Sequence, residues 1–228
     1  MSLFDYIYPP DCLSCGELLK HGRKFLCPRC QSSWEIGKRR EINKQIHMEH
    51  PFHWRIGYRP DMPIAVENRL LLRFKYKADA RIVDFLASEM AIFIAALDIL
   101  PADGKAVLAW IPRREQNVKK HGYDHMARLA GRLSKQFSIP KQRLLTRTVD
   151  AAEQKRLSAK ERWMNASKTI VLAPKADCAG KTVILLDDIA TTGASLRAAS
   201  DLLMGIGARE VICVSTAVAE HRQAESSG

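Results

Sequence analysis

The sequence predicts an α/β fold in which a parallel sheet carries helices on both faces, with a small cysteine-containing module in front of it. Short apolar runs at residues 106–111, 183–186 and 211–218 have the composition of strands buried on both faces. Between them, apolar residues recur at three- and four-residue steps, the pattern of helices that pack on a sheet. Because strands and helices alternate, right-handed crossovers between parallel strands are expected.

Residues 181–195 (KTVILLDDIATTGAS) combine a buried strand, an acidic pair and a turn of small residues. We expect the strand to end where Asp187 and Asp188 begin, at the carboxyl edge of the sheet, where open α/β folds bind ligands. These two carboxylates can accept hydrogen bonds from vicinal hydroxyls. The small residues after them let backbone N–H groups converge on one anion at the start of the next helix. Those residues are Ala190, Thr191, Thr192, Gly193, Ala194 and Ser195.

A phosphate bound next to a diol indicates a sugar phosphate as the ligand. The alternative is an ordinary helix cap with solvated aspartates. LLDDIATTGAS resembles the binding signature of the type I phosphoribosyltransferases, whose ligand is 5-phosphoribosyl-1-pyrophosphate (PRPP). The resemblance implies that Asp187 and Asp188 hold the ribose hydroxyls, that the turn at 190–195 holds the 5-phosphate, and that Mg²⁺ accompanies PRPP.

The formal net charge of +11 is concentrated in one part of the chain. Residues 105–168 contain 16 Lys and Arg against 5 Asp and Glu, and the rest of the chain is balanced. A positive surface beside the phosphate turn would attract pyrophosphate, nucleic acid or both, and a solubilising surface is the alternative. Arg113 and Arg114 follow the strand at 106–111 in the expected loop RREQNVKKHG, where they could bind a second phosphate group. An exposed loop without a ligand is the other interpretation.

Four of the six cysteines are spaced C-x2-C-x11-C-x2-C. This spacing is close to that of a four-thiolate zinc site and predicts a small zinc-ribbon-like module with a structural Zn²⁺. Two disulfides are the alternative, but the start of the chain lacks a signal peptide, so we expect a reducing compartment. The longest apolar stretch, 90–100, is too short to span a bilayer, which predicts a cytoplasmic protein. The proposed ligands are Cys12, Cys15, Cys27 and Cys30.

The expected elements follow one another along the chain. Strands are expected at 52–58, 106–111, 141–147, 169–172, 183–186 and 211–218, and helices at 63–76, 82–97, 126–137 and 196–206. The domains are a four-cysteine zinc module (1–34), a linker (35–51), a phosphoribosyltransferase-like domain (52–220) and a disordered tail (221–228).

Three further stretches resemble the ComF family, which joins a phosphoribosyltransferase-like domain to an amino-terminal four-cysteine zinc module. They are FKYKAD at 74–79, IPRR to HGYDHMARLA at 111–130 and RTVDAAEQKRLSAKERWMN at 147–165. The resemblance implies a role in natural transformation and in handling single-stranded DNA. It places Arg147 and Arg162 in the mobile active-site loop region as catalytic residues together with the acidic pair. Gln154, Leu157 and Asn165 match the same region, and Gly122, Leu129 and Ala130 match the pyrophosphate loop.

The sequence also departs from the family pattern. It reads HGYDH at 121–125, where the family usually reads Arg-Gly-Phe-Asn-Gln, and Ala78 replaces a glycine. Losing an arginine and gaining a carboxylate weakens anion binding at this loop. We therefore expect pyrophosphate contact and catalysis to be weaker than ribose phosphate binding.

Three functions fit these features. The first is a PRPP-binding protein of DNA uptake that contacts single-stranded DNA through phosphates, with stacking on Trp54, Tyr58 or Trp163. The second is an active phosphoribosyltransferase with an unknown acceptor. In the third, PRPP is a signal that changes contact with a DNA-uptake helicase or another competence protein.

Overall fold

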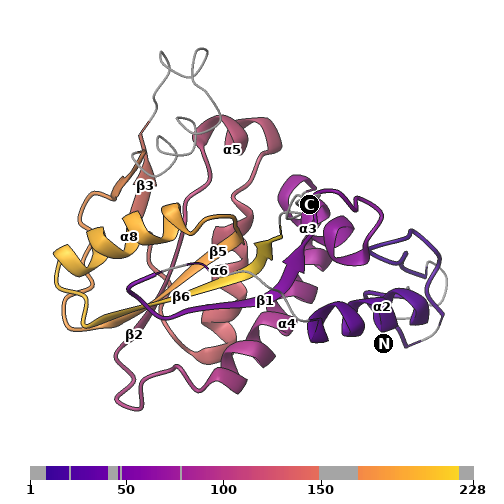
Figure 1. The fold of residues 1–228 in the computed structure, drawn as a ribbon, viewed down its shortest axis with the longest axis horizontal. Coiled ribbons are helices and arrows are strands. Elements are labelled where there is room, and N and C mark those ends of the chain that lie inside the picture. The colour runs from indigo at the N-terminus through magenta and orange to yellow at the C-terminus, as the bar shows by residue number, and fades with distance from the viewer. Residues whose placement is uncertain are drawn as a thin grey trace, which may run out of the picture.

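The computed structural model describes residues 9–20, 22–40, 46, 48–77, 79–148 and 169–220 (Figure 1). Arg162, Gln154, Leu157, Asn165, Trp163, Ala78 and the tail at 221–228 lie outside these residues. The described elements are α2 (Pro28–Arg39), β1 (Phe52–Tyr58), α3 (Val66–Tyr76), α4 (Ala80–Leu97), β2 (Ala106–Trp110), α5 (Glu115–His121), α6 (His125–Phe137), β3 (Leu145–Arg147), β4 (Ile170–Leu172), β5 (Thr182–Ala190), α8 (Ala194–Gly205) and β6 (Glu210–Ala219).

The core is a parallel sheet of four strands in the order β1-β6-β5-β2, which confirms the expected α/β fold. Strand β5 lies between two partners: Leu186 is paired with Trp110 of β2, and Asp187 with Ser215 of β6. Because the strands are parallel, their carboxyl ends lie at one edge of the sheet. The residues that follow β2 and β5 are therefore brought to the same place.

Helices cover both faces of the sheet, and the alternation along β5 decides which residues face each layer. Ile184 and Leu186 belong to a hydrophobic cluster with α4 and α6, whereas Val183 and Leu185 pack with Leu196 and other residues of α8. Figure 1 shows α8 in front of the sheet and α6 behind it. The apolar stripe expected at 82–97 is buried in the α4 layer.

The structure differs from the expectations in three respects. Residues 115–121 form helix α5 instead of a loop, because Glu115 in its first turn and three basic residues in its last turn suit the helix dipole. Strand β5 continues to Ala190 because β6 is long enough to pair with it that far, so Asp187 and Asp188 lie within the strand. Strands β3 and β4 form a separate antiparallel pair outside the parallel sheet.

The four-cysteine segment packs directly on the main domain. Cys12, Leu13 and Trp34 belong to the same hydrophobic cluster as α3 and α4, and the rings of Trp34 and Phe85 meet edge to face. Helix α2 begins at Pro28 and ends at Arg39, so it crosses the expected boundary at residue 34. The domain limits themselves stay a prediction. In the described part of the chain, no helix combines the length and apolarity that a membrane crossing requires.

A second anchor of this segment is a cluster of charged groups around Glu89 of α4. The Glu89 carboxylate accepts hydrogen bonds from Trp34 Nε1 (2.9 Å), Lys38 Nζ (3.0 Å) and Arg55 Nη2 (3.0 Å). The first two donors belong to α2 and the third to β1, so a single carboxylate ties α2, α4 and β1 together. Burial raises the pKa of Glu89, but these three donors outweigh burial and lower it overall.

Candidate functional site

The acidic pair lies near the carboxyl end of β5. Asp187 is 9% exposed, and its Oδ1 accepts a hydrogen bond from the backbone N–H of Asp188 at 2.9 Å. The Oδ1 of Asp188 accepts one from the backbone N–H of Ile189 at 2.7 Å. These local bonds fix both carboxylates relative to the strand.

Two side chains from other elements meet the second oxygen of Asp188. Nε2 of His125, the first residue of α6, lies 3.0 Å from Asp188 Oδ2, and Nζ of Lys75, from α3, lies 3.3 Å from the same atom. His125 is 3% exposed, and the ring of Phe74 packs edge-on against it. Both basic residues lie in stretches that resemble ComF, yet the sequence alone gives neither of them a role in the site.

The environments of the two aspartates separate their pKa values. Burial and the neighbouring Asp188 carboxylate raise the pKa of Asp187 to about 7. Burial also acts to raise the pKa of Asp188, but the hydrogen bond with His125 and the charge of Lys75 outweigh it, so this pKa lies well below its usual range. The charge of Asp188 in turn raises the pKa of Lys75. Asp188 is therefore ionised at neutral pH, whereas Asp187 titrates close to neutral pH.

Basic residues border the acidic pair on the side of β2 and β3. Arg147 donates from Nε to Pro112 O at 2.8 Å and from Nη1 to Thr169 Oγ1 at 2.9 Å. Burial and the nearby charge of Arg114 lower the pKa of Arg147, while Asp187 and Asp188 act to raise it. The charges of Arg147 and Arg114 thus interact electrostatically, and the charge of Arg147 also interacts with the acidic pair.

Arg113 is held between aromatic rings. Its guanidinium lies 5.9 Å from the ring centre of Tyr76 and 5.8 Å from that of Tyr123, and Nη1 donates to Tyr123 O at 3.4 Å. Its Nε and Nη2 are buried without a hydrogen-bond partner among the described residues. Because buried polar groups are normally paired, these donors are suited to an anionic oxygen of a ligand.

The turn after β5 leads into α8 through Gly193. This residue has φ +76° and is the N-cap of α8, so no Thr or Ser side chain occupies the capping position. Ala190 ends β5, while Ala194 and Ser195 lie in the first turn of α8. The backbone N–H groups of that turn point out of the N-terminus of α8, and a helix N-terminus favours a bound anion.

The protein's own side chains cover one side of this turn. A Cβ atom added to Gly193 would lie 2.5 Å from Ile46 Cγ2 and 3.4 Å from Met48 Sδ. No side chain fits there, so the glycine is required by close packing as well as by its backbone angles. A ligand must therefore reach the turn from another side.

The loop that departs from the ComF pattern has clear internal roles. Asp124 caps α6 by accepting from the backbone N–H groups of Met126 (3.0 Å) and Ala127 (3.2 Å), and its other oxygen accepts from Trp110 Nε1 at 3.2 Å. The hydroxyl of Tyr123 donates to the backbone carbonyl of Phe74 at 3.0 Å. The added carboxylate therefore serves as a helix cap and has both oxygens occupied.

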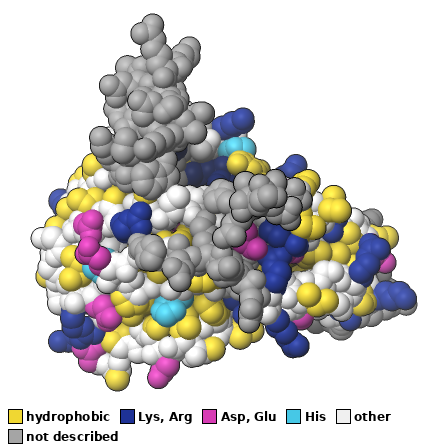
Figure 2. All heavy atoms as spheres, in the orientation of Figure 1, with side chains coloured by type: hydrophobic (Ala, Val, Ile, Leu, Met, Phe, Trp, Pro, Cys, Tyr) yellow, Lys and Arg dark blue, Asp and Glu magenta, His cyan; other side chains and the backbone are white. Residues whose placement is uncertain are grey.

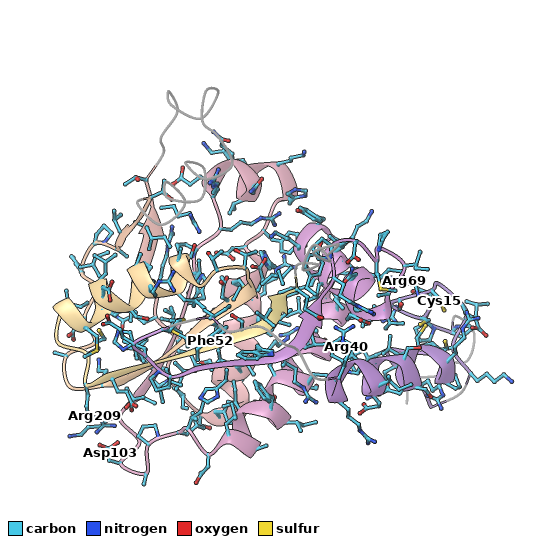
Figure 3. The ribbon with its side chains drawn as sticks, viewed as in Figure 1. Cys15, Arg40, Phe52, Arg69, Asp103 and Arg209 are labelled. Carbon is cyan, nitrogen blue, oxygen red and sulfur yellow. The ribbon has the colours of Figure 1, made fainter. Side chains whose placement is uncertain are left out.

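The four proposed metal ligands come together. The sulfur atoms of Cys12, Cys15, Cys27 and Cys30 all lie within 4.8 Å of one another, with Cys15 and Cys27 at 3.7 Å. Tetrahedral zinc with Zn–S bonds of about 2.3 Å requires sulfur atoms about 3.8 Å apart, so the four thiols fit Zn²⁺. The backbone N–H of Cys27 also points to Cys12 Sγ at 3.4 Å. Cys15 lies at the opposite end of the molecule from the ion pair of Asp103 and Arg209 (Figure 3).

Comparison with known proteins agrees with this fold. Residues 127–228 match the model of the phosphoribosyl transferase domain family. The match contains β5, the acidic pair and α8, and it begins within α6. The match covers less than half of the chain, so this part of the chain is similar to a phosphoribosyl transferase domain. No curated protein matches the sequence.

Several solved structures are similar at low identity. A glutamine PRPP amidotransferase from B. subtilis is 15% identical with a TM-score of 0.42, over 64% of this chain and 30% of that one. A phosphoribosylpyrophosphate synthetase from Mycobacterium smegmatis is 13% identical with a TM-score of 0.41, over 86% of this chain and 79% of that one. A purine phosphoribosyltransferase from Pyrococcus horikoshii is 17% identical with a TM-score of 0.36, over 60% and 73%. The chain thus spans less than a third of the amidotransferase.

Proposed function

We propose that this protein binds PRPP where β5 meets α8. The observation that carries the proposal is the acidic pair, with Asp187 buried and Asp188 15% exposed at its side chain, which stands before the Gly193 turn at a helix N-terminus. The two carboxylates would accept hydrogen bonds from the ribose hydroxyls, and the first turn of α8 would hold the 5-phosphate. Arg113, Arg114 and Arg147 would receive the pyrophosphate.

Magnesium would accompany PRPP at this site. Mg²⁺ is usually held by one or two carboxylates together with substrate phosphates, and Asp187 and Asp188 fit the protein's share of that ligand set. When bound, the ion would neutralise part of the pyrophosphate charge. The contacts of Asp188 with Lys75 and His125 would keep its carboxylate oriented and ionised.

Calorimetric titration with PRPP and magnesium tests this proposal. Asp187→Asn combined with Asp188→Asn should abolish binding while the fold is retained. Asp98→Asn combined with Asp201→Asn removes the same charge from two exposed positions and should bind like the parent protein. Equal binding by both double variants would refute the assignment.

Phosphoribosyl transfer is a second candidate, favoured by the cationic side chains that border the acidic pair. The site would stabilise the positive charge of an oxocarbenium-like state of the ribose, while Arg113, Arg114 and Arg147 hold the departing pyrophosphate. Release of pyrophosphate from PRPP with a panel of bases and amines measures this activity. If no acceptor in a broad panel supports release, the transferase proposal fails while PRPP binding can still stand.

The finer proposal is a ComF-type protein that handles single-stranded DNA in natural transformation. It is supported by the family resemblance, the positive charge and the four-cysteine cluster. Figure 2 shows Lys and Arg side chains on the face that is turned to the viewer, including the end of the molecule that carries α2. Affinity for a single-stranded oligonucleotide should fall steeply as salt rises, and salt-insensitive binding would contradict it. A change in that affinity when PRPP is added would favour PRPP as a signal.

A further inference from the structure

A groove of about 660 Å³ lies along α6. Its walls come from the start of α4, the turn at 122–124, the outer side of α6 and Lys141 beyond the end of that helix. The lining includes neither Asp187 nor Asp188, nor their partners His125 and Lys75. The groove therefore does not contain the acidic pair, and it adjoins Arg113 through Tyr123 in its lining.

The charged groups of the groove are mainly cationic. Arg128, Arg132, Lys135 and Lys141 line it, and Asp124 is the one carboxylate among its lining residues. Both oxygens of Asp124 are occupied by Trp110 and by the backbone of α6. Asp124 therefore supplies the single negative charge in the lining, against four cations.

Three of these cations have no acidic partner among the described residues. Arg132 pairs with Asp84 at 2.5 Å, but no ion pair within the described ranges involves Arg128, Lys135 or Lys141. The guanidinium of Arg128 lies over the ring of Tyr123 at 4.8 Å, which fixes it on the groove wall. Like charges gathered in a concave surface repel one another and attract an anion.

Gly131 helps to bring these charges together. A Cβ atom added there would lie 3.1 Å from Lys141 Nζ, so the ammonium group sits directly on the surface of α6. Glycine is a poor helix former, and here its missing side chain leaves room for a lysine that comes from outside the helix. Lys141 consequently lies beside the helix that carries Arg128 and Lys135.

We propose that this groove is a second phosphate-binding site, distinct from the PRPP site. Its ligand is a molecule with several phosphate groups, because Arg128 offers a planar set of donors and the two lysines offer point charges at neighbouring positions. Such groups are present in a free polyphosphate and in a nucleic acid strand. The shared chemistry is a row of phosphate oxygens along α6.

The test compares two matched double variants of the full-length, zinc-loaded protein. Lys135→Gln with Lys141→Gln removes two exposed groove lysines, and Lys105→Gln with Lys175→Gln removes two exposed lysines elsewhere. Inorganic tripolyphosphate and a labelled single-stranded oligonucleotide are titrated without magnesium. We expect about tenfold weaker binding of at least one probe by the groove variant and no comparable loss by the control.

A third protein separates this site from the PRPP site. Asp187→Asn with Asp188→Asn should keep the binding that the groove variant loses. Tighter binding of the oligonucleotide identifies a nucleic acid strand as the ligand, and tighter binding of tripolyphosphate identifies a free polyphosphate. Equal affinities for the groove and control variants, or a loss confined to the acidic-pair variant, would overturn the proposal.

Discussion

Nε2 of His125 lies 3.0 Å from Oδ2 of Asp188, and this contact joins the first residue of α6 to the acidic pair of β5. The imidazole is buried, and its Nδ1 has no hydrogen-bond partner among the described residues. Because an ionised carboxylate can only accept, Nε2 carries a proton and donates a hydrogen bond to Asp188. His125 stands where the ComF pattern has glutamine, which can also donate a hydrogen bond.

His125→Ala should destabilise the protein by about 2 kcal/mol, because it leaves the ionised Asp188 with one donor fewer. His125→Gln should restore much of this loss. The lowered pKa of Asp188 contributes stability above about pH 4, and that contribution is lost as pH falls. The cost of His125→Ala should therefore shrink at low pH, as measured by denaturant unfolding. His53→Ala on β1 is the control, and an equal cost at all pH values would contradict the ionic role.

The raised pKa of Asp187 predicts a pH dependence of the free energy of unfolding opposite to that of Asp188. A carboxyl whose pKa is raised to about 7 binds more protons in the folded than in the unfolded state between about pH 4 and pH 7. Its contribution to the free energy of unfolding thus falls as pH rises through this window. Asp187→Asn should gain stability relative to the parent at about pH 8 compared with about pH 5, whereas exposed Asp201→Asn should not. Parallel pH curves for parent and Asp187→Asn would exclude the raised pKa.

Gly193→Ala should be more damaging than an alanine at another glycine with positive φ. Gly193 has both φ +76° and a Cβ position 2.5 Å from Ile46 Cγ2, whereas Gly104 has φ +67° and open space. Backbone strain alone costs about 1–2 kcal/mol, so Gly104→Ala should lose that much and Gly193→Ala clearly more. Adding Ile46→Ala should recover the difference in a double-mutant cycle. Equal losses at both glycines would mean that the contact with Ile46 carries no energy.

Removal of the metal should affect the main domain. The four-cysteine segment shares a hydrophobic cluster with α3 and α4. If the segment lost its order without the metal, apolar surface of both helices would be exposed. We expect Cys15→Ser to lower the zinc content and to reduce the thermal midpoint by about 5 °C or more. Cys178→Ser, at a buried cysteine outside the cluster, should leave the zinc content unchanged. Full metal content in Cys15→Ser would contradict the four-thiolate site.

The local patterns of the sequence predicted much of the fold because burial imposes them. The apolar runs at 106–111 and 183–186 became β2 and the first half of β5, and the two CxxC pairs brought four thiols together. Helix α5 was missed because its polar composition resembles a loop and its stability comes from charges at its two ends. The length of β5 was missed because it depends on pairing with β6.

The sequence by itself determined the strand, the acidic pair, the small turn and the cysteine spacing, since these features are contiguous or nearly so. Only the tertiary structure decided that Lys75, His125 and Asp188 meet, that Ile46 closes one side of Gly193, and that Lys141 reaches the groove on α6. The first two of these contacts join residues far apart in the chain, and they depend on the order of parallel strands and on helix packing. No local pattern of residues encodes that order.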